Sequence, residues 1–498
     1  MNWLGLGAVL FFYILIFGIG YWASTKSKAG DSDDFLLAGR KLPMWIAMLT
    51  MAATWIGGGY INGTAEAAAA SGLVWVQAPW GYGLSLIIGG IFFARKMRRY
   101  QFRTMLDPLS QRFGKKATGL FFLPALFGEI FWVAAILTAL GTTFSVIIGL
   151  DIQTSILLSA AIAIVYTTIG GLWSVAYTDV LQLGLLIFGL LLVMPFLFEG
   201  VGGFDQLKIQ YNEKFGSAAS FVPNKSVMGN YFWNWLDYAL LLVFGGIPWQ
   251  VYFQRVLAAR TEKTAMWFSI IAGFICIAVA IPAALVGMVG AVTDWSSLGL
   301  SGPINAASTL PYVFQYLTPS YIAIIGLGAI AAAVMSSIDS SMLSASTLAV
   351  WNVYKPLVKP DLANENLLKI LKRTIVIVGI VATILSLKVD SIYALWFLCS
   401  DFVYCLLFPA LVCALFDSKA NSIGALSGFF IAAILRFGGG DATLGIPTII
   451  PYPMIEDGVV LFPFRTLAMV SGLLTSILVS RLTLKISPSI QLKMIEPS

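Results

Sequence analysis

Long apolar segments alternate with short polar connections along the whole chain. A helix needs about 20 residues, mostly apolar, to cross the hydrocarbon core of a bilayer. The pattern therefore predicts an all-α polytopic membrane protein with 13 transmembrane helices, forming a single membrane domain over residues 1–498. The predicted helices lie near 3–24, 43–71, 73–94, 119–149, 152–170, 173–198, 229–254, 265–293, 310–350, 374–387, 391–416, 421–436 and 462–480.

Composition supports a membrane protein and excludes several soluble classes. Hydrophobic residues make up 59% of the chain and charged residues 11%, whereas soluble domains have about 45–50% and about 25%. The chain contains no histidine, which removes bis-histidine haem ligation, the commonest zinc sites and histidine proton relays. Its four cysteines lie in apolar stretches without a paired motif, so neither a disulfide framework nor a redox centre is predicted.

The lysines and arginines predict how the protein is oriented. With the N-terminus outside and the C-terminus inside, all but six of the 30 fall in cytoplasmic segments, as the positive-inside rule requires. The six on the outer side are Lys208, Lys214, Lys225, Lys388, Arg436 and Arg465. A basic cluster at 95–99 is expected to face anionic membrane lipid, and no nucleic-acid partner is expected.

Six acidic residues fall inside the predicted spans, and the sequence places no lysine or arginine deep in any span. Ionised side chains at the bilayer centre are costly and usually mark an ion or substrate path. Unbalanced negative charge points to a cation, with Asp179 and Asp339 favoured as functional. Protonation, or hydrogen bonding at helix ends, is the alternative for each one singly. The six are Glu66, Glu129, Asp179, Asp237, Asp339 and Asp401.

Two spans contain sequences that disfavour a continuous helix. The second has three consecutive glycines at 57–59, and the seventh has Gly245, Gly246 and Pro248. Irregular backbone at membrane depth is tolerated where it lines protein or a wet cavity, and matched breaks in two halves indicate a transporter site. The spacing predicts inverted repeats over 43–198 and 229–416, preceded by an extra helix at 3–24 and followed by two helices at 421–480. Close packing through glycine is the alternative.

Aromatic and hydroxyl side chains near these breaks suggest two kinds of site. Trp55 and Trp249 flank the breaks, and Tyr82 and Trp132 lie in mid-span. Several aromatic faces around one cavity bind a quaternary ammonium group, although core packing explains each residue singly. The stretch 336–341 in the ninth span carries four serines and Asp339, an oxygen-rich set that suits Na⁺ or interhelical hydrogen bonding.

Several long motifs resemble the sodium:solute symporter family, and within it the members that carry choline. The motifs are YTTIGGLWS at 166–174 followed by YTD at 177–179, ATWIGGGYINGTAE at 53–66, MLDP at 105–108, GEIFW at 128–132, GGIPWQVYFQRVL at 245–257 and AAVMSSIDSSMLSAS at 332–346. They are spread over nearly the whole chain.

The resemblance implies a LeuT-like core of five plus five inverted helices in the plasma membrane. It implies uptake of choline coupled to Na⁺, with Cl⁻ dependence in animal members and competition by hemicholinium-like inhibitors. By matching positions, an aromatic cage for choline consists of Trp55, Tyr82, Trp132 and Trp249. The sodium site consists of the carbonyls of Ala52, Trp55 and Ala333 with the hydroxyls of Ser336 and Ser337. A second cation site would use Asp179, Asp339 and Ser340.

Other functions remain open on the residues alone. A sodium symporter for betaine or proline is the first alternative, although the betaine carboxylate would require a cationic partner. A sugar would require hydrogen-bonding side chains at the break, which Gly57–Gly59 do not supply. A channel is also possible, but matched broken helices favour alternating access. A redox or lipid-modifying membrane enzyme has no recognisable cofactor site here, so no enzyme activity is expected.

Overall fold

The computed structural model describes residues 3–25, 36–169, 172–389, 391–456 and 458–495 and is almost entirely helical. A two-stranded hairpin, β1 (Ile455–Glu456) and β2 (Val459–Val460), lies in the loop before the last helix. The principal helices are α1 (Trp3–Ser24), α3 (Met44–Trp55), α4 (Gly58–Ala70), α5 (Ala78–Ile88), α6 (Arg95–Arg99), α7 (Asp107–Phe113), α8 (Lys115–Ile148), α9 (Ile152–Ile169), α10 (Leu172–Gly200), α11 (Phe204–Phe215), α12 (Lys225–Met228), α13 (Tyr231–Gly245), α14 (Gln250–Ala258), α15 (Glu262–Val292), α16 (Thr309–Leu317), α17 (Ser320–Leu348), α18 (Asn364–Ser386), α19 (Ile392–Phe402), α20 (Phe408–Phe416), α21 (Ser422–Gly438) and α22 (Phe464–Leu482).

All thirteen predicted segments coincide with helices, and the described residues include nine helices long and apolar enough to span a bilayer. A tenth is added when the bent pair α3 and α4 is counted as one span. The count of thirteen spans stays a prediction, because α9, α18 and α21 are not among these ten helices. α9 and α21 are shorter, and α18 has charged first turns. Two boundaries were wrong: the segment 310–350 is two helices, because Pro319 separates α16 from α17, and the segment predicted at 374–387 begins ten residues earlier, at Asn364.

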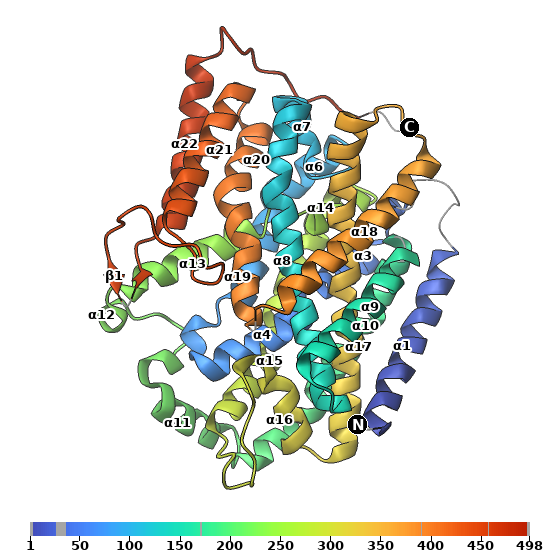
Figure 1. Cartoon of the computed structure of the whole chain (residues 1–498), viewed down its shortest axis with the longest axis vertical. Coiled ribbons are helices and arrows are strands. Elements are labelled where there is room, and N and C mark those ends of the chain that lie inside the picture. Colours follow the sequence, from blue (N-terminus) through green and yellow to red (C-terminus); the bar gives the residue numbers. More distant parts are fainter. Residues whose placement is uncertain (1–2, 26–35, 170–171, 390, 457, 496–498) are drawn as a thin grey trace.

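The helices form one bundle built around a few long members (Figure 1). α8 and α17 pack together at the centre, α10 packs along α17, and α15 lies against α4 and α5. α1 stands at one edge, and the pair α21 and α22 stands at the opposite edge. Many large apolar side chains of α1, such as Trp3 and Ile14, each 73% exposed, face outward, as a bilayer requires.

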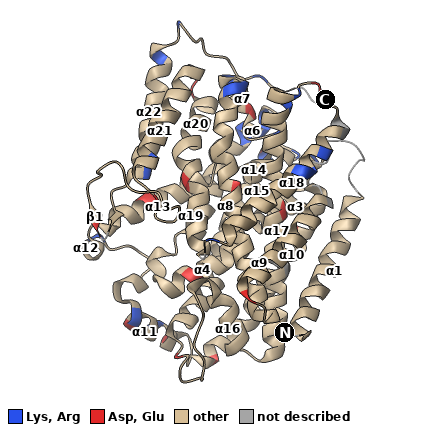
Figure 2. Ribbon diagram, viewed as in Figure 1, with Lys and Arg blue, Asp and Glu red and all other residues tan. Residues whose placement is uncertain are grey.

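The two ends of the bundle differ in charge. Figure 2 shows Lys and Arg gathered around α6, α7 and the start of α18, at the end where the described chain finishes. The start of α1 lies at the opposite end, which fits an odd number of crossings (Figure 1). Within the basic cluster, Arg99 pairs with Glu262 at 3.0 Å, and Lys96 lies 4.6 Å from the Phe416 ring.

Candidate functional site

The predicted break in the second span is present and lies against α17. α3 ends at Trp55, α4 begins at Gly58, and the two helices are bent by 47°. A Cβ atom at Gly57 would lie 1.9 Å from the Ser337 Oγ, so only glycine permits this approach. The Ala52 carbonyl keeps its helical bond to the Ile56 amide at 2.8 Å, whereas the Thr54 carbonyl beside the break accepts from the Ser337 hydroxyl of α17.

The second predicted break separates α13 from α14 at residues 246–249 and packs against α5. Trp249 is the N-cap of α14 and has an extended backbone. A Cβ atom at Gly246 would lie 2.4 Å from the Ser85 Oγ and 2.9 Å from the Tyr82 ring. Glycine therefore allows this break to approach the helix that carries Tyr82.

The four predicted cage residues come together into one aromatic cluster from four different helical segments. The ring centroids of Trp55 and Tyr82 are 4.9 Å apart, and those of Trp55 and Trp249 are 5.1 Å apart and stacked. Trp132 lies edge-on to Trp249 at 5.3 Å. Each of the four side chains is at most 3% exposed, so the cluster lies in the interior of the bundle.

A fifth aromatic residue, Trp396 of α19, belongs to the same cluster and was not predicted. Its ring stacks on Tyr82 at 5.3 Å and lies 5.8 Å from Trp132. The Tyr82 hydroxyl is 2.5 Å from the Ser400 hydroxyl, one turn further along α19. The position in mid-span that pointed to Trp132 does not apply to Trp396, which lies near the start of its predicted span at 391–416.

The cage holds unused hydrogen-bond donors. The indole N–H groups of Trp55, Trp132, Trp249 and Trp396 are buried and have no protein acceptor. An unpaired buried donor costs about 1–3 kcal/mol, so an acceptor entering the cage would relieve that cost. Rings stacked 5.1 Å apart leave no room for a trimethylammonium group between them, so the cage must open to admit a ligand of that size.

The predicted sodium residues also gather at the first break. Ala52 and Trp55 lie in the last turn of α3, facing Ser336 and Ser337 of α17. The Ser337 hydroxyl donates to the Thr54 carbonyl at 3.1 Å, and the Ser336 hydroxyl donates to Asp179 at 2.6 Å. Ala333 falls within α17, but its surroundings lie outside the described residues. Hydroxyl, carbonyl and carboxylate oxygens thus converge here, the ligand type that hard cations prefer.

The predicted second cation site contains a buried arginine that the sequence reasoning had placed at the cytoplasmic edge. Arg255 of α14 donates to Asp179 at 3.4 Å and to the Ser340 hydroxyl at 2.5 Å, and its side chain is fully buried. Asp339 lies beside this group, and its Oδ2 has no hydrogen-bond partner. The three predicted residues are therefore close together, with Arg255 as a fourth member that was missed.

The expectation that no basic residue reaches the acids inside the spans was wrong. Besides Arg255, Arg436 donates two hydrogen bonds of 2.6 Å to Asp401. Arg465 donates to Asp401 at 2.8 Å and lies 3.6 Å from Asp237. Arg436 and Arg465 were expected on the outer side, at the ends of predicted spans, yet both side chains are buried in the bundle.

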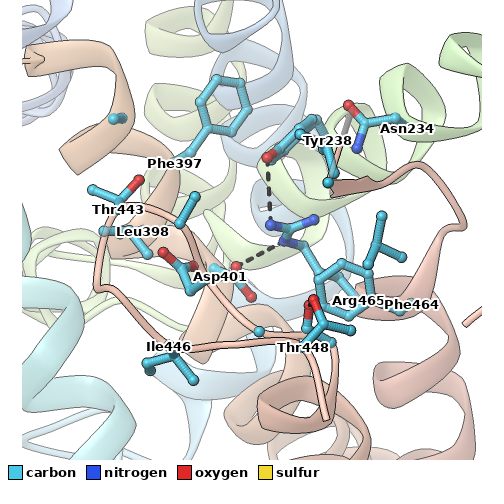
Figure 3. A pocket seen from close by; sticks show the side chains of 18 of the residues that line it. Asn234, Tyr238, Phe397, Leu398, Asp401, Thr443, Ile446, Thr448, Phe464 and Arg465 are labelled. Carbon is cyan, nitrogen blue, oxygen red and sulfur yellow. Dashed lines mark hydrogen bonds and ion pairs between the residues drawn. The ribbon is translucent and has the colours of Figure 1, made fainter. Parts of the chain in front are cut away.

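These outer ion pairs line a cavity of about 300 Å³ beside α19 (Figure 3). Arg465 reaches across the cavity wall to Asp401 and to the Tyr238 hydroxyl. Asp401 and Trp396 point in directions about 140° apart around α19, because five residues rotate the helix by about 500°. The two side chains therefore lie on nearly opposite faces of this helix. The cavity and the aromatic cage are therefore distinct features on two sides of one helix.

The two buried glutamates differ in their surroundings. Glu66 accepts hydrogen bonds from the Ser391 hydroxyl at 2.6 Å and from the Tyr393 amide at 3.2 Å, at the start of α19. Glu129 of α8 is 3% exposed, and neither of its carboxylate oxygens has a hydrogen-bond partner. Glu66 is thus explained as a helix-end residue, whereas Glu129 is not explained by the packing of the protein.

Comparison with known proteins identifies the family. The sodium:solute symporter family model matches residues 35–432. The chain belongs to the sodium:solute symporter family. Membership of this family makes the protein a membrane transporter and not an enzyme.

Curated relatives match over nearly the full chain. High-affinity choline transporter 1 of Drosophila melanogaster is 46% identical over 492 residues, covering 96% of this chain and 78% of the relative. The Homo sapiens high affinity choline transporter 1 is 44% identical over 499 residues, covering 96% and 85%. The sodium/glucose cotransporter of Vibrio parahaemolyticus is 24% identical over 75% of this chain and 72% of its own.

Solved structures show which fold this is. A Na⁺-coupled sialic acid symporter in a substrate-bound outward-open state superposes with a TM-score of 0.79 at 20% identity, covering 97% of this chain and 98% of that one. A nucleobase–cation symporter in a closed conformation superposes with a TM-score of 0.55 at 13% identity, covering 91% and 95%. The fold is accordingly the LeuT-like fold of these transporters.

Proposed function

We propose that this protein is a sodium-coupled choline symporter that binds the quaternary ammonium group in the aromatic cage. The observation that carries the proposal is the convergence of Trp55, Tyr82, Trp132, Trp249 and Trp396 from five segments. A quaternary ammonium group has no hydrogen to donate, so aromatic faces recognise it through cation–π attraction. The choline hydroxyl oxygen can accept from an indole N–H that the protein leaves unpaired.

Sodium binds, in this proposal, between the end of α3 and the serines of α17. The ligands are the carbonyls of Ala52, Trp55 and Ala333 with the hydroxyls of Ser336 and Ser337. The site touches the same break that positions Trp55, so Na⁺ braces the broken helix and sets the cage. A second Na⁺ would use Asp179, Asp339 and Ser340, with Arg255 displaced from the Ser340 hydroxyl.

Transport then follows by alternating access. Choline and Na⁺ enter from outside, the cage closes on the headgroup, and rocking of one repeat against the other releases both inside. We propose that residues 43–198 and 229–416 form the two inverted repeats, with thirteen spans in the plasma membrane, the N-terminus outside and the C-terminus inside. The basic residues at the end of the bundle that carries α6 support this orientation.

Betaine and proline are the second candidates, and the names of the curated relatives favour choline over them. Both carry a carboxylate, which requires a cationic group or free helix N-terminal amides. Arg255 is the buried cation near the cage, and it is already engaged by Asp179 and Ser340. The curated relatives with 44–46% identity are named for choline, which supports the same choice.

The test is uptake of labelled choline into proteoliposomes with and without an inward Na⁺ gradient. We expect accumulation that requires the gradient, exceeds uptake of betaine and proline, and is competed by hemicholinium-like inhibitors. Replacing external chloride with gluconate in the same assay tests the chloride dependence implied for animal members. Uptake that ignores Na⁺ or prefers betaine or proline would overturn the proposal.

A further inference from the structure

Glu129 stands out among the buried charges, because its carboxylate is deep in the bundle and unpartnered. It is 3% exposed, and neither oxygen reaches a hydrogen-bond donor of the protein. A buried carboxylate without partners is either protonated or neutralised by a cation, because an isolated charge is very costly in the interior. The protein itself gives Glu129 no such partner among the described residues.

Glu129 lies on the same helix as the cage residue Trp132. It precedes Trp132 by three residues on α8, so the two side chains share one helix face with Cβ atoms about 5–6 Å apart. Next to it, a Cβ atom at Gly128 would come within 2.8 Å of the Cys399 carbonyl, so α8 and α19 are in close contact here. Cys399 in turn lies 3.4 Å from the Tyr82 hydroxyl.

On its other side, Glu129 faces the cation cluster. Its polar neighbours are the Ser341 hydroxyl, the Val251 amide and the Arg255 guanidinium, none of which makes a well-formed hydrogen bond to it. The Ser341 hydroxyl also has no partner. Glu129 therefore lies between Trp132 of its own helix and Arg255, which contacts Asp179 and Ser340 of the proposed second cation site.

The charges in this region do not balance within the protein. Asp179, Asp339 and Glu129 are the carboxylates that surround the Arg255 guanidinium. Arg255 contacts Asp179 and Ser340 directly, so two negative charges are unmatched when all three carboxylates are ionised. Two monovalent cations would neutralise them, one at the Asp179 and Asp339 side and one at the Glu129 side.

We propose that Glu129 is a substrate-binding residue that supplies the counter-charge for the quaternary ammonium group. This inference rests on the proposed function. It adds one residue that makes binding specific for a positively charged ligand. The aromatic rings favour the cation through cation–π attraction, by about 30-fold in a desolvated site, but their contact area also binds a neutral ligand of the same shape. A carboxylate beside Trp132 discriminates by charge, because its attraction exists only for the cation.

The experiment varies the charge of the residue and the charge of the ligand together. Binding of choline and of dimethylbutanol, its uncharged carbon isostere, is measured by calorimetry on the purified full chain in Na⁺. The variants are Glu129→Gln, which removes the charge and keeps the shape, and Glu129→Asp, which keeps the charge. Glu66→Gln is the matched control, because it neutralises a buried glutamate that the protein already hydrogen-bonds.

We expect Glu129→Gln to weaken choline binding about 30-fold or more, the usual consequence of removing one partner of a buried charge pair. Binding of dimethylbutanol should change less than about twofold, and Glu129→Asp should restore part of the choline affinity. Glu66→Gln should leave the ratio of the two affinities as in the wild type.

Equal weakening of both ligands by Glu129→Gln would assign Glu129 a structural role and overturn the inference. Unchanged binding of both would show that Glu129 is protonated and neutral, and would overturn it equally. The same experiment distinguishes failure of the proposed function from failure of this inference. A wild-type protein that does not bind choline contradicts the proposed function, whereas normal wild-type binding with an unaltered ratio in Glu129→Gln contradicts this inference alone.

Discussion

Two groups of buried charges in this protein are satisfied in opposite ways. Beside α19, Asp401 accepts hydrogen bonds of 2.6–2.8 Å from two arginines, and Asp237 is bonded by the Thr466 amide and hydroxyl. At the centre, Glu129 has no partner at all, and one oxygen of Asp339 has none. Both groups are equally buried, so burial does not separate them.

The difference indicates which charges belong to the scaffold and which serve a ligand. A carboxylate held by two fixed guanidinium groups has its charge neutralised permanently and ties helices together. A carboxylate without a cationic side chain as partner can be neutralised by a cation that binds and dissociates. On this basis the outer network fastens α21 and α22 to the bundle, and we propose that the centre binds the transported cations.

The largest effect is expected from breaking the outer network. Asp401→Asn keeps the shape of the side chain but leaves Arg436 and Arg465 without their shared carboxylate. Loss of one partner of a buried ion pair costs about 3–5 kcal/mol, so the Tm of the purified protein in detergent should fall strongly. A Tm equal to that of the wild type would show that this network does not stabilise the bundle.

The next largest effect is expected on choline affinity when the cage is truncated. A cation–π contact in a desolvated site is worth about 2 kcal/mol, so Trp55→Ala and Trp249→Ala should each weaken choline binding by about 30-fold or more. Trp235→Ala is the matched control, because Trp235 stacks on Trp80 at 5.8 Å outside the cage. Calorimetry and Tm together separate loss of binding from loss of folding. Affinity unchanged in both cage variants would mean that choline binds elsewhere.

A smaller effect is expected at the hydroxyls of α17. Removing a hydroxyl that contacts a charged ligand costs about 1.5–3 kcal/mol, so Ser336→Ala and Ser337→Ala should raise the Na⁺ concentration for half-maximal uptake by about tenfold or more. Choline affinity at saturating Na⁺ should stay near the wild-type value. Ser346→Ala on the same helix is the control, since its hydroxyl bonds only the Met342 carbonyl. An unchanged Na⁺ dependence in the first two variants would move the sodium site away from α17.

The smallest effect is expected at an ion pair outside the spans. Burial opposes ionisation of Asp417, but hydrogen bonds from Arg481 and the Lys419 amide outweigh it and hold the pKa of this carboxyl below its usual value. Its contribution is therefore present above about pH 4 and lost as the pH falls through the folded pKa. Because Arg481 is 39% exposed, Asp417→Asn should cost less than about 1 kcal/mol at pH 7 and less still at pH 3. A loss of stability as large as that caused by Asp401→Asn would contradict the expected difference between buried and exposed ion pairs.

Much of the fold and of the cage could be predicted from the sequence, for identifiable reasons. A long apolar stretch predicts a membrane-spanning helix directly. The glycines at 57–59 and the Gly-Gly-Ile-Pro stretch at 245–248 predict the two breaks, because these residue types disfavour helix wherever they occur. Resemblance to the sodium:solute symporter family predicted that Trp55, Tyr82, Trp132 and Trp249 form one cage. The structure brings these four side chains together.

The partners of the buried acids could not be predicted in this way. Hydropathy places Arg255, Arg436 and Arg465 at the ends of spans, and only tertiary packing shows that their long side chains turn into the bundle. The same limit applies to Trp396, whose contact with Tyr82 joins residues more than 300 positions apart in the chain. Contacts between helices that are distant in sequence leave no periodic signal.

The central claim is that two cations share one centre through the break between α3 and α4. It is tested most directly by measuring the Kd of choline without Na⁺ and at saturating Na⁺, and the affinity for Na⁺ without and with choline. Linkage requires the two ratios to be equal, and the account predicts that both exceed one, because Na⁺ at Ser337 braces the helix end that carries Trp55. Ratios equal to one, or choline binding that weakens as Na⁺ rises, would contradict it.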